Sequence, residues 1–508
     1  MAAGDTYPKS QGGSNASSAA PLRAIPAKPD DPFVWGSVTK LLTGVDVLHH
    51  VERGALRVTD LAHPLVDPFF RAWHAADPAT WNFSSMADLW GPAANEITVA
   101  HLASMTAGVP DYDSSGGKVD LFRAQCYADP GREWGAPALF TEPWEATALL
   151  FPPGSQKAYS SSNFVLLGLA LARLRNGSTT QWDSYEQAAV LRLAEAASTV
   201  GYKYRSVAFG AHGTPWSHGA VYGFDRSSAN GNNPRSVPGF DVTSVAGVFG
   251  GWTASDMVAT VADVAELTHE IFGPAKRLLS QASVDLMTTF PVPQPGAPEP
   301  LSYGFAAFDL AARTGQEFSP WGVAVGHMGA TYGYQSVAIY SLPMNFSIAV
   351  ASNIETDMQV QPNEALCLVF NAVKNMLLGE EDASCSDAGG SYYKGACACN
   401  DTVPATAFLC SSDPAGGGGC YGVQNGTAGA TDKATCEQGC QAPTPPPSPK
   451  PVPTPKPTYP NFCHFRSDCN YHGNCVNSAA CVCDDGFTGP RCENATATAA
   501  AVEQAPSS

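Results

Sequence analysis

The residues of this chain best suited to chemistry are a serine and a lysine three positions apart, Ser37 and Lys40, in the stretch FVWGSVTKLLTG. Positions three apart on an α-helix lie on one face, so the hydroxyl and the amine can meet. A lysine amine that is partly neutral can take the proton of a serine hydroxyl and make its oxygen a nucleophile. The pair therefore predicts acyl transfer through a covalent serine intermediate.

An amphipathic helix is expected to carry this pair. Leu41, Val45 and Leu48 recur at helical spacing and form an apolar stripe that would bury one side of the helix. Gly54 is expected to mark the end of the helix. The serine and the lysine would then be held on a rigid element.

Residues 31–380 mix helical and strand patterns, which indicates an α+β domain. VAVGHMG, QSVAIYSL and FSIAVASN are predicted as successive antiparallel strands, with LPMN as the turn between the last two. A one-sided helix is predicted to follow, with apolar residues at Leu366, Phe370, Val373 and Leu377. The upstream part differs, because residues 1–36 show no strand alternation.

Composition limits the classes of protein to consider. The chain has 508 residues, 44% of them hydrophobic and 15% charged, which is typical of one large globular domain with appendages. Its 28 Lys and Arg against 46 Asp and Glu give a net charge of -18, so a nucleic-acid-binding surface is not expected. No apolar run has the length needed to span a bilayer.

The cysteines divide the chain into unlike regions. Thirteen of the fifteen lie between Cys385 and Cys492, and such crowding indicates disulfides formed in an oxidising compartment. The predicted segments are a disordered start at 1–30, the main domain at 31–380, a cysteine-rich segment at 385–440, a Pro-rich linker at 441–460, a small disulfide-rich module at 461–493 and a disordered tail at 494–508.

Other features bear on secretion. Residues 1–30 lack the basic segment and apolar run of a signal peptide. We nevertheless expect a secreted glycoprotein, with either an incomplete N-terminus or an unconventional export route. The expectation rests on the cysteines and on seven N-x-S/T sequons, at Asn15, Asn82, Asn176, Asn345, Asn400, Asn425 and Asn494.

The last six cysteines end with CVCDDGFTGPRC, which resembles the epidermal-growth-factor-like module. The resemblance implies an interaction module for an extracellular protein or glycan partner, and a spacer or stabilising cap is the alternative. No calcium site is expected, because Tyr459, Pro460, Asn461 and Phe462 stand where the calcium-binding variety has acidic residues. The disulfides that the resemblance implies are Cys463 with Cys475, Cys469 with Cys481, and Cys483 with Cys492.

The main domain also resembles a known group. FVWGSVTKLLTG followed by VERGALRVTD is similar to the opening of the serine β-lactamase and penicillin-binding-protein superfamily, particularly its esterase and D-peptidase branches. ITVAHLASMTAGVPDYD resembles the first long helix and turn of that superfamily, and MVATVADVAEL resembles the helix before its final sheet. The resemblance covers roughly residues 33–378. It implies an antiparallel sheet flanked by helices and an all-helical subdomain, and a sheet that lacks its first strands here.

A second motif, FPPGSQKAYSSSNFVLLG, fits the superfamily in two registers. It can be read as Tyr159-Ser160-Ser161 of the Y-x-N type or as Ser161-Ser162-Asn163 of the S-x-N type. Phe164 and the following L-L-G fall where the Y-x-N branch has them, which favours Tyr159. A positive charge near a tyrosine favours phenolate below the usual pKa of about 10. Tyr159 is therefore the predicted general base beside Lys40.

The third motif is His327-Met328-Gly329, on a predicted strand where lactam-cleaving relatives have K-T-G. By resemblance, the amides of Ser37 and Ala330 would form an oxyanion hole. A histidine with a pKa near about 6.5 is mostly neutral at pH 7, so His327 would anchor a substrate carboxylate weakly. The resemblance also implies that Ser161 stands where lactam-cleaving relatives have an asparagine that contacts the substrate. Both departures favour esters or peptides over anionic lactams.

Two functions remain open at this point. The first is a serine hydrolase that acts through an acyl-enzyme on a small ester or peptide substrate, with no cofactor and no metal. The second is a catalytically inactive, secreted binding or matrix protein that keeps the hydrolase fold. A trypsin-like or α/β-hydrolase triad is not expected, because the chain contains no G-x-S-x-G motif.

Overall fold

The computed structural model describes residues 5–6, 25–113, 120–141, 146–177, 179–198, 201–227, 239–290, 302–315, 321–356 and 360–379, together with four short strands after residue 472. The chain divides into two compact units, Met1–Leu378 and Gly379–Ser508. Among the described residues, no helix has both the length and the apolar character needed to cross a bilayer.

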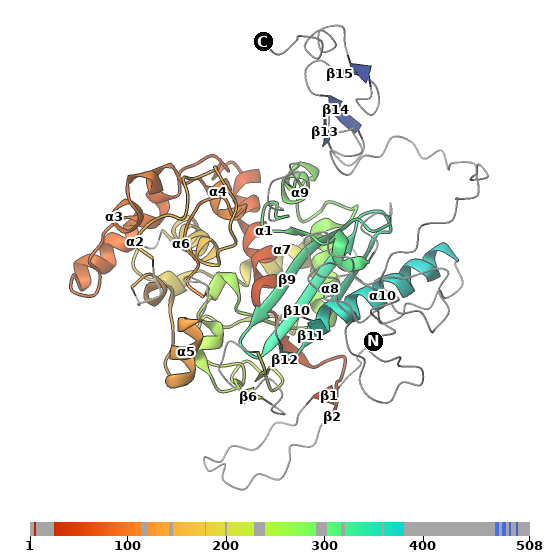
Figure 1. The fold of residues 1–508 in the computed structure, drawn as a ribbon, viewed down its shortest axis with the longest axis horizontal. Coiled ribbons are helices and arrows are strands. Elements are labelled where there is room, and N and C mark those ends of the chain that lie inside the picture. The colour runs from red at the N-terminus through yellow and green to blue at the C-terminus, as the bar shows by residue number, and fades with distance from the viewer. Residues whose placement is uncertain are drawn as a thin grey trace, which may run out of the picture. The chain divides into compact units, whose positions relative to one another are not determined.

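All helices among the described residues lie in the first unit (Figure 1). Its α-helices are α1 (Thr39–Glu52), α2 (His63–Ala76), α3 (Met86–Trp90), α4 (Val99–Ala103), α5 (Leu121–Ala128), α6 (Ser162–Asn176), α7 (Ala189–Ala197), α8 (Val261–Phe272), α9 (Gln281–Met287) and α10 (Val360–Leu378). Its 3-10 turns are η1 (Gly36–Val38), η2 (Pro92–Glu96), η3 (Ala136–Phe140), η4 (Trp182–Ser184), η6 (Ala246–Phe249), η7 (Trp252–Ala254) and η8 (Ala311–Thr314).

The main sheet is antiparallel, with strand order β11-β10-β9-β8. Its long strands confirm the three strands predicted from the sequence, and the turn of residues 342–345 is the predicted LPMN. The bounds are β8 (Phe308–Asp309), β9 (Ala324–Thr331), β10 (Tyr334–Ser341) and β11 (Phe346–Ser352).

Smaller sheets complete the unit. One has the order β3-β7-β4, made of β3 (Pro32–Val34), β7 (Met257–Thr260) and β4 (Ala208–Phe209). A second has the order β12-β5-β6, made of β12 (Ile354–Glu355), β5 (Phe224–Asp225) and β6 (Phe240–Asp241). A third pairs β1 (Asp5–Thr6) with β2 (Ile25–Pro26). Residues 1–36 show no strand alternation in the sequence, yet they contain the short strands β1, β2 and β3, and β3 pairs antiparallel with β7 just before the serine motif. Within the described residues, none of the three belongs to the main sheet.

Helices α8 and α10 cover opposite faces of the main sheet. Ser347 donates to the carbonyl of Ala265 on α8, whereas the ring of Phe346 packs 5.4 Å from that of Phe370 on α10. Because adjacent residues of a strand point to opposite faces, the two helices lie on different sides. The predicted helix over Leu366 and Phe370 is thus confirmed, although Leu377 at its end is 52% exposed.

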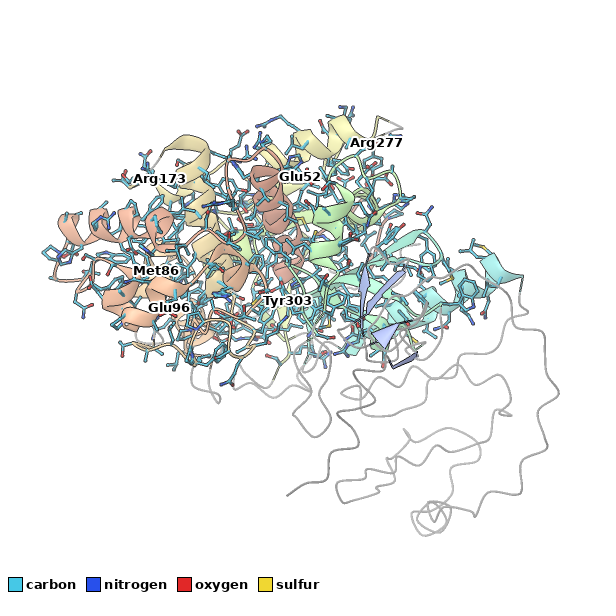
Figure 2. All side chains as sticks on the ribbon, turned by 90° about the horizontal axis from the view of Figure 1, so that it is seen from above. Glu52, Met86, Glu96, Arg173, Arg277 and Tyr303 are labelled. Carbon is cyan, nitrogen blue, oxygen red and sulfur yellow. The ribbon has the colours of Figure 1, made fainter. Side chains whose placement is uncertain are left out.

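A helical region that includes α2, α3, α4 and α6 lies to one side of the main sheet, and α1 contacts both α6 and β9 (Figure 1). Side chains fill the space between these elements (Figure 2). Phe69, Phe70 and Met86 are among the fully buried core residues. The mixed helix and sheet fold predicted for the main domain is therefore confirmed, but α4 is a five-residue helix and not the long helix that the resemblance implied.

The second unit is described only as two strand pairs, β13 (Gly473–Val476) with β14 (Ala480–Cys483), and β15 (Phe487–Thr488) with β16 (Asn494–Ala495). Within the first pair, the backbone of Cys475 lies opposite that of Cys481. The predicted linker, Cys463, Cys469 and Cys492 lie outside the described residues, so the growth-factor-like module and its disulfides stay predictions.

Candidate active site

Ser37 lies on a sharp turn that joins β3 to α1. The turn is anchored by Trp35, whose backbone N–H donates to Met257 and whose indole N–H donates to Ala259. Gly36 has a φ of +52°, and a Cβ built on it would lie 2.7 Å from the carbonyl oxygen of Ala330. Only glycine fits this close approach without strain. The turn therefore brings Ser37 against strand β9.

Ser37 and Lys40 meet as the sequence predicted, but by a different geometry. Ser37 belongs to the 3-10 turn η1 and Lys40 to the first turn of α1. In a 3-10 turn, side chains three residues apart are eclipsed, so they are even closer neighbours than on an α-helix. Lys40 Nζ lies 2.8 Å from Ser37 Oγ.

Lys40 is fully buried in a polar but uncharged set of contacts. Its amine also donates to Ser161 Oγ at 3.2 Å and to the carbonyl of Ala254 at 2.9 Å. Burial lowers the pKa of Lys40 to about 7, and the more distant charges of Asp111 and Asp113 oppose only part of that change. A lysine with this pKa is about half neutral at pH 7, so it can act as a base.

Tyr159 lies just before α6, beside the serine and the lysine. Its side chain hydrogen-bonds with Ser37 and Ser161, and Lys40 Nζ lies 5.0 Å from the centre of its ring. The predicted shift toward phenolate is wrong, because burial raises the pKa of Tyr159 well above its usual value. The prediction assumed that Lys40 is charged, but burial lowers the pKa of Lys40, so the amine is charged for only part of the time at pH 7. Tyr159 is therefore a phenol that can donate a proton or pass one on.

His327 lies on β9 behind Tyr159, and the two ring centres are 6.2 Å apart. It is fully buried and is not part of the cavity wall described below. Tyr303 Oη lies 2.9 Å from its Nε2, and its Nδ1 lies 2.5 Å from the carbonyl oxygen of Met328. Since a carbonyl only accepts, Nδ1 carries the proton and Nε2 accepts from Tyr303. Burial lowers the pKa of His327 well below its usual value, so the ring is neutral.

The backbone of β9 supplies the second predicted amide. The β9–β10 hairpin closes at the pair Thr331 and Tyr334, which exchange both backbone hydrogen bonds. Because such pairs alternate along an antiparallel ladder, the next pair, Ala330 with Gln335, has its N–H and C=O groups turned outward. The Gly36 turn lies directly against Ala330. The amide of Ala330 thus faces the same edge as Ser37, as an oxyanion hole requires.

Gly329 serves the packing of this edge. A Cβ built on Gly329 would lie 2.0 Å from the carbonyl oxygen of Trp35 and 2.3 Å from Ser336 Oγ. Ser336 donates to that same Trp35 carbonyl. Glycine is therefore needed to let the nucleophile turn rest on β9, which explains the residue at this place in the third motif.

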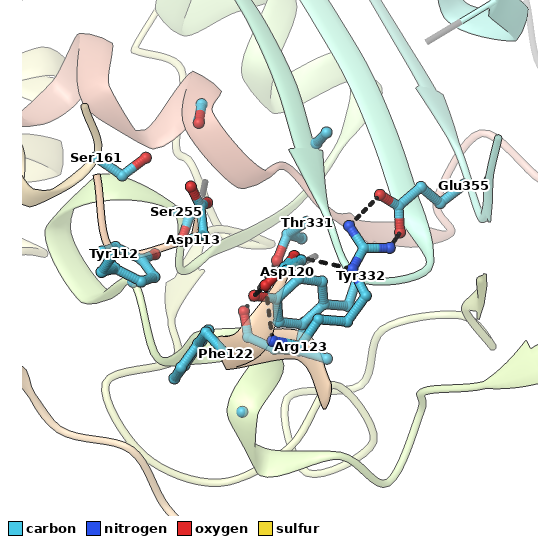
Figure 3. Close-up of a pocket in the computed structure, with 15 residues that line it drawn as sticks. Tyr112, Asp113, Asp120, Phe122, Arg123, Ser161, Ser255, Thr331, Tyr332 and Glu355 are labelled. Atoms are coloured by element: carbon cyan, nitrogen blue, oxygen red, sulfur yellow. Dashed lines mark hydrogen bonds and ion pairs between the residues drawn. The ribbon is translucent and has the colours of Figure 1, made fainter. Parts of the chain in front are cut away.

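A cavity of about 210 Å³ opens beside Ser37, Ser161 and Ala330 (Figure 3). Its further lining residues are Tyr112, Asp113, Asp120, Phe122, Arg123, Gly247, Val248, Gly251, Ser255, Thr331, Tyr332 and Glu355. None of these residues was predicted from the sequence to belong to the site, although Tyr112 and Asp113 lie in the quoted stretch ITVAHLASMTAGVPDYD. The lining residues come from segments more than 200 residues apart, and an isolated aspartate or arginine carries no signal of its own in the sequence.

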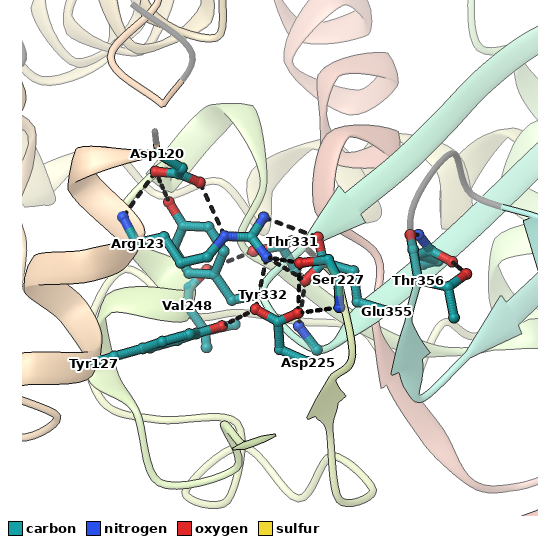
Figure 4. Close-up of polar contacts among 12 residues, drawn as sticks. Asp120, Arg123, Tyr127, Asp225, Ser227, Val248, Thr331, Tyr332, Glu355 and Thr356 are labelled. Atoms are coloured by element: carbon teal, nitrogen blue, oxygen red, sulfur yellow. Dashed lines mark hydrogen bonds and ion pairs between the residues drawn. The ribbon is translucent and has the colours of Figure 1, made fainter. Parts of the chain in front are cut away.

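Arg123 forms ion pairs that link several segments around the part of the cavity lined by Asp120 and Glu355 (Figure 4). Its guanidinium is paired with Asp120 at 3.0 Å, with Asp225 at 2.6 Å and with Glu355 at 2.9 Å. Burial opposes its charge, but Glu355 and Asp225 outweigh that and raise the pKa of Arg123 well above its usual value. Glu355 also accepts from the amide of Gly333. The cluster therefore fastens α5 to the β9–β10 hairpin, which carries Ala330.

The chain is similar to one known protein family and to several solved structures. Residues 9–366 match the family model described as Beta-lactamase. A D-stereospecific amidohydrolase from Streptomyces sp. is similar in structure, with 20% identity, 66% of this chain and 86% of that chain covered, and a TM-score of 0.46. A D-amino acid amidase from Ochrobactrum anthropi SV3 shares 18% identity over 69% of this chain and 86% of its own, with a TM-score of 0.49.

A penicillin binding protein from Bacillus halodurans shares 17% identity over 69% of this chain and 88% of its own, with a TM-score of 0.46. A search of curated proteins found no match. The family model covers more than two thirds of the 508 residues and includes the serine, tyrosine and histidine motifs. The chain therefore belongs to the Beta-lactamase family.

Proposed function

We propose that this protein hydrolyses esters or amides through an acyl-enzyme formed on Ser37. The observation that carries the proposal is the 2.8 Å contact between Ser37 Oγ and a buried Lys40 whose pKa lies at about 7. When Lys40 is neutral, its lone pair can accept the Ser37 proton. No residue from a distant loop is needed for that first step.

The remaining groups have roles that follow from their positions. The Ser37 oxygen attacks the substrate carbonyl while Lys40 takes the proton, and the amides of Ser37 and Ala330 stabilise the oxyanion. Tyr159, which hydrogen-bonds with Ser37, passes a proton to the leaving group. Lys40 then returns its proton to the Tyr159 oxygen through Ser161, which both groups contact, and becomes neutral again. Water attacks the acyl-enzyme while Lys40 accepts its proton, and the Lys40 ammonium gives that proton to the Ser37 oxygen when the acyl bond breaks.

The charge of the site supports neutral or cationic substrates over anionic lactams. His327 is neutral and lies behind Tyr159, so it offers no charge to a substrate carboxylate. Arg123 is already paired with three carboxylates of the protein. This agrees with the esters or peptides favoured by the sequence. We also propose export from the cell, on the cysteine and sequon pattern alone.

The test uses the full chain, wild type and Ser37→Ala, with a fluorophosphonate probe and with p-nitrophenyl acetate and butyrate. We expect labelling of the wild type, a labelled peptide that contains Ser37, and ester turnover. Both signals should vanish in Ser37→Ala and persist in the control Ser155→Ala, which changes an exposed serine. Labelling that survives Ser37→Ala, or a folded wild type without turnover, would contradict the proposal and favour a binding protein.

A further inference from the structure

We infer that Met105 is a positioning residue for Tyr159. Its carbonyl and its sulfur hold the backbone on the two sides of the tyrosine, so that the phenol lies against Ser37. Met105 is not one of the fifteen residues that line the cavity, so it acts through Tyr159. The inference rests on the proposed function, because it concerns the proton that Tyr159 passes to the leaving group.

Met105 follows the end of α4, in a conformation that favours glycine. The N–H of Thr106 donates to the carbonyl of His101 at 2.9 Å, and the N–H of Met105 donates to that of Leu102 at 3.4 Å. These two bonds form the Schellman motif that ends many helices. Met105 occupies its left-handed position, with a φ of +62°. Glycine is usual there, because a β-carbon crowds the next carbonyl oxygen. The helix end therefore does not explain a methionine.

The contacts of the Met105 side chain supply the explanation. The side chain is fully buried, and its sulfur accepts the backbone N–H of Ser160 and the side-chain amide of Asn163, both at 3.4 Å. Its carbonyl accepts the backbone N–H of Ala158 at 3.0 Å. The residues before and after Tyr159 are thus both bonded to Met105. A thioether is a weak acceptor, but here two donors converge on it.

The contact with Asn163 also bears on the two registers of the second motif. Asn163 would be the site residue of an S-x-N motif, but its amide bonds to Met105 and it does not line the cavity, whereas Ser161 does. Asn163 belongs to the first turn of α6. Helices α4 and α6 lie side by side (Figure 1). Met105 therefore couples the end of α4 to the start of α6, directly after Tyr159.

The position of Tyr159 matters most for leaving groups that need a proton. Tyr159 hydrogen-bonds with Ser37, and an error of about 1 Å in the place of such a group can lower a rate by about 10²-fold. The contact of Ser37 with Lys40 is formed within one turn of the chain, so it does not depend on Met105. Loss of the sulfur should therefore slow the departure of basic leaving groups and spare the attack by Ser37.

The experiment compares methyl butyrate with p-nitrophenyl butyrate, which form the same acyl-enzyme. Methoxide needs a proton to leave, whereas p-nitrophenolate does not. Met105→Leu keeps the bulk of the side chain but removes the sulfur. We expect its kcat/KM to fall by about tenfold for methyl butyrate and by less than about twofold for p-nitrophenyl butyrate.

Two further variants sharpen the comparison. Met105→Gln offers an amide oxygen to the same donors, so it should restore kcat/KM for methyl butyrate to within about threefold of the wild type. The matched control Met86→Leu changes another fully buried methionine, on α3, and should leave both esters unaffected.

Equal losses for the two esters in Met105→Leu would mean that Met105 only stabilises the fold, and this would overturn the inference. An unchanged value for methyl butyrate would overturn it as well, and so would a wild type that cleaves only the p-nitrophenyl ester. If the wild type hydrolyses p-nitrophenyl butyrate and Ser37→Ala does not, the acyl-enzyme proposal stands whatever Met105 does. If Met105→Leu does not fold, Asn163→Leu decides, because it removes one of the two donors to the sulfur. Methyl butyrate should again lose more than p-nitrophenyl butyrate, and parallel losses would contradict the inference.

Discussion

Two buried basic side chains, Lys40 and Arg123, lie at the same site, and their pKa values change in opposite directions. Lys40 contacts two hydroxyls and one carbonyl, and burial lowers its pKa to about 7. Arg123 contacts three carboxylates. Burial opposes its charge, but two of these carboxylates, Glu355 and Asp225, raise its pKa further above the usual value. Burial disfavours the charge of both groups, so the difference comes from their partners.

The comparison separates a reactive charge from a structural one. A buried amine without a paired carboxylate gives up its proton near neutral pH, and this makes it useful as a base. A buried guanidinium that is fully paired cannot lose its proton and can only hold segments together. The site therefore has a reactive side, defined by Ser37, Lys40 and Tyr159, and a structural side, defined by Arg123 and its carboxylates.

The largest effect is expected from Lys40→Arg, which replaces an amine that can be neutral by a guanidinium that stays charged. We expect ester turnover to fall by about 10³-fold or more, because no base remains next to Ser37. The rate of p-nitrophenol release from p-nitrophenyl acetate, compared between the variant and the wild type, measures this loss of turnover. Lys276→Met is the matched control, since Lys276 also has a lowered pKa and donates to carbonyls at the end of α8. Activity in Lys40→Arg within tenfold of the wild type would refute the distinction.

The second prediction concerns the structural side. Arg123→Met leaves buried carboxylates without their cation, and we expect the free energy of unfolding at pH 8 to fall by about 3–5 kcal/mol. Urea denaturation measures it. Arg192→Met removes the exposed ion pair with Glu186 and should leave the free energy of unfolding nearly unchanged. Equal losses in the two variants would show that the Arg123 cluster has no special role.

The same variant has a predictable dependence on pH. Burial already raises the pKa of Asp120 to about 6 and that of Glu355 to about 7, and loss of Arg123 would raise both further. The folded variant then binds more protons than its unfolded chain between about pH 4.5 and 8. Its stability must therefore fall as the pH rises through that range. The deficit relative to the wild type should be smaller at pH 5 than at pH 8.

Tyr159→Phe tests the phenol on the reactive side. We expect kcat for a p-nitroanilide substrate to fall by about 10²-fold, because the leaving amine loses its proton donor while Lys40 can still activate Ser37. The acylation burst with p-nitrophenyl acetate should suffer less than the hydrolysis of an anilide, since p-nitrophenolate leaves without a proton. Equal losses for ester and anilide would argue against proton donation by Tyr159.

Activity should also follow the protonation of Lys40. The base must be neutral, so kcat/KM for p-nitrophenyl acetate should rise with pH through about 7 and level off above it. Below pH 7 we expect a loss of about tenfold per pH unit, measured between pH 5 and 9. If kcat/KM instead rises with pH up to about 10 before it levels off, Lys40 keeps the pKa of an exposed lysine.

The sequence predicted the reactive side much better than the structural side. Ser37 and Lys40 are local neighbours, so their contact depends on three residues of backbone. The long strands of the main sheet were found for a similar reason, since alternation within one strand is visible in the sequence. The contact of Arg123 with Glu355 joins residues 232 positions apart. Such a pairing follows only from the packing of α5 against the hairpin.

The failed prediction for Tyr159 has a physical origin as well. The sequence showed a tyrosine near a lysine, and charge alone would lower the pKa of the phenol. The depth of burial cannot be read from the motif, and burial raises that pKa and neutralises much of the lysine charge. Likewise, the K-T-G comparison placed His327 on a strand but could not show that Tyr303 and Phe308 pack around it.

The smallest effect is expected from Tyr303→Phe, behind the reactive side. This change removes the hydrogen bond to His327 Nε2 but keeps the ring that packs 4.6 Å from Phe308. His327 then has an unsatisfied acceptor, which can shift the ring against Tyr159 without removing any group that touches the substrate. We expect kcat to fall less than tenfold, with an unchanged KM for p-nitrophenyl butyrate. A loss as large as that of Tyr159→Phe would place His327 and Tyr303 in the proton path, and the reactive side would then extend behind the tyrosine.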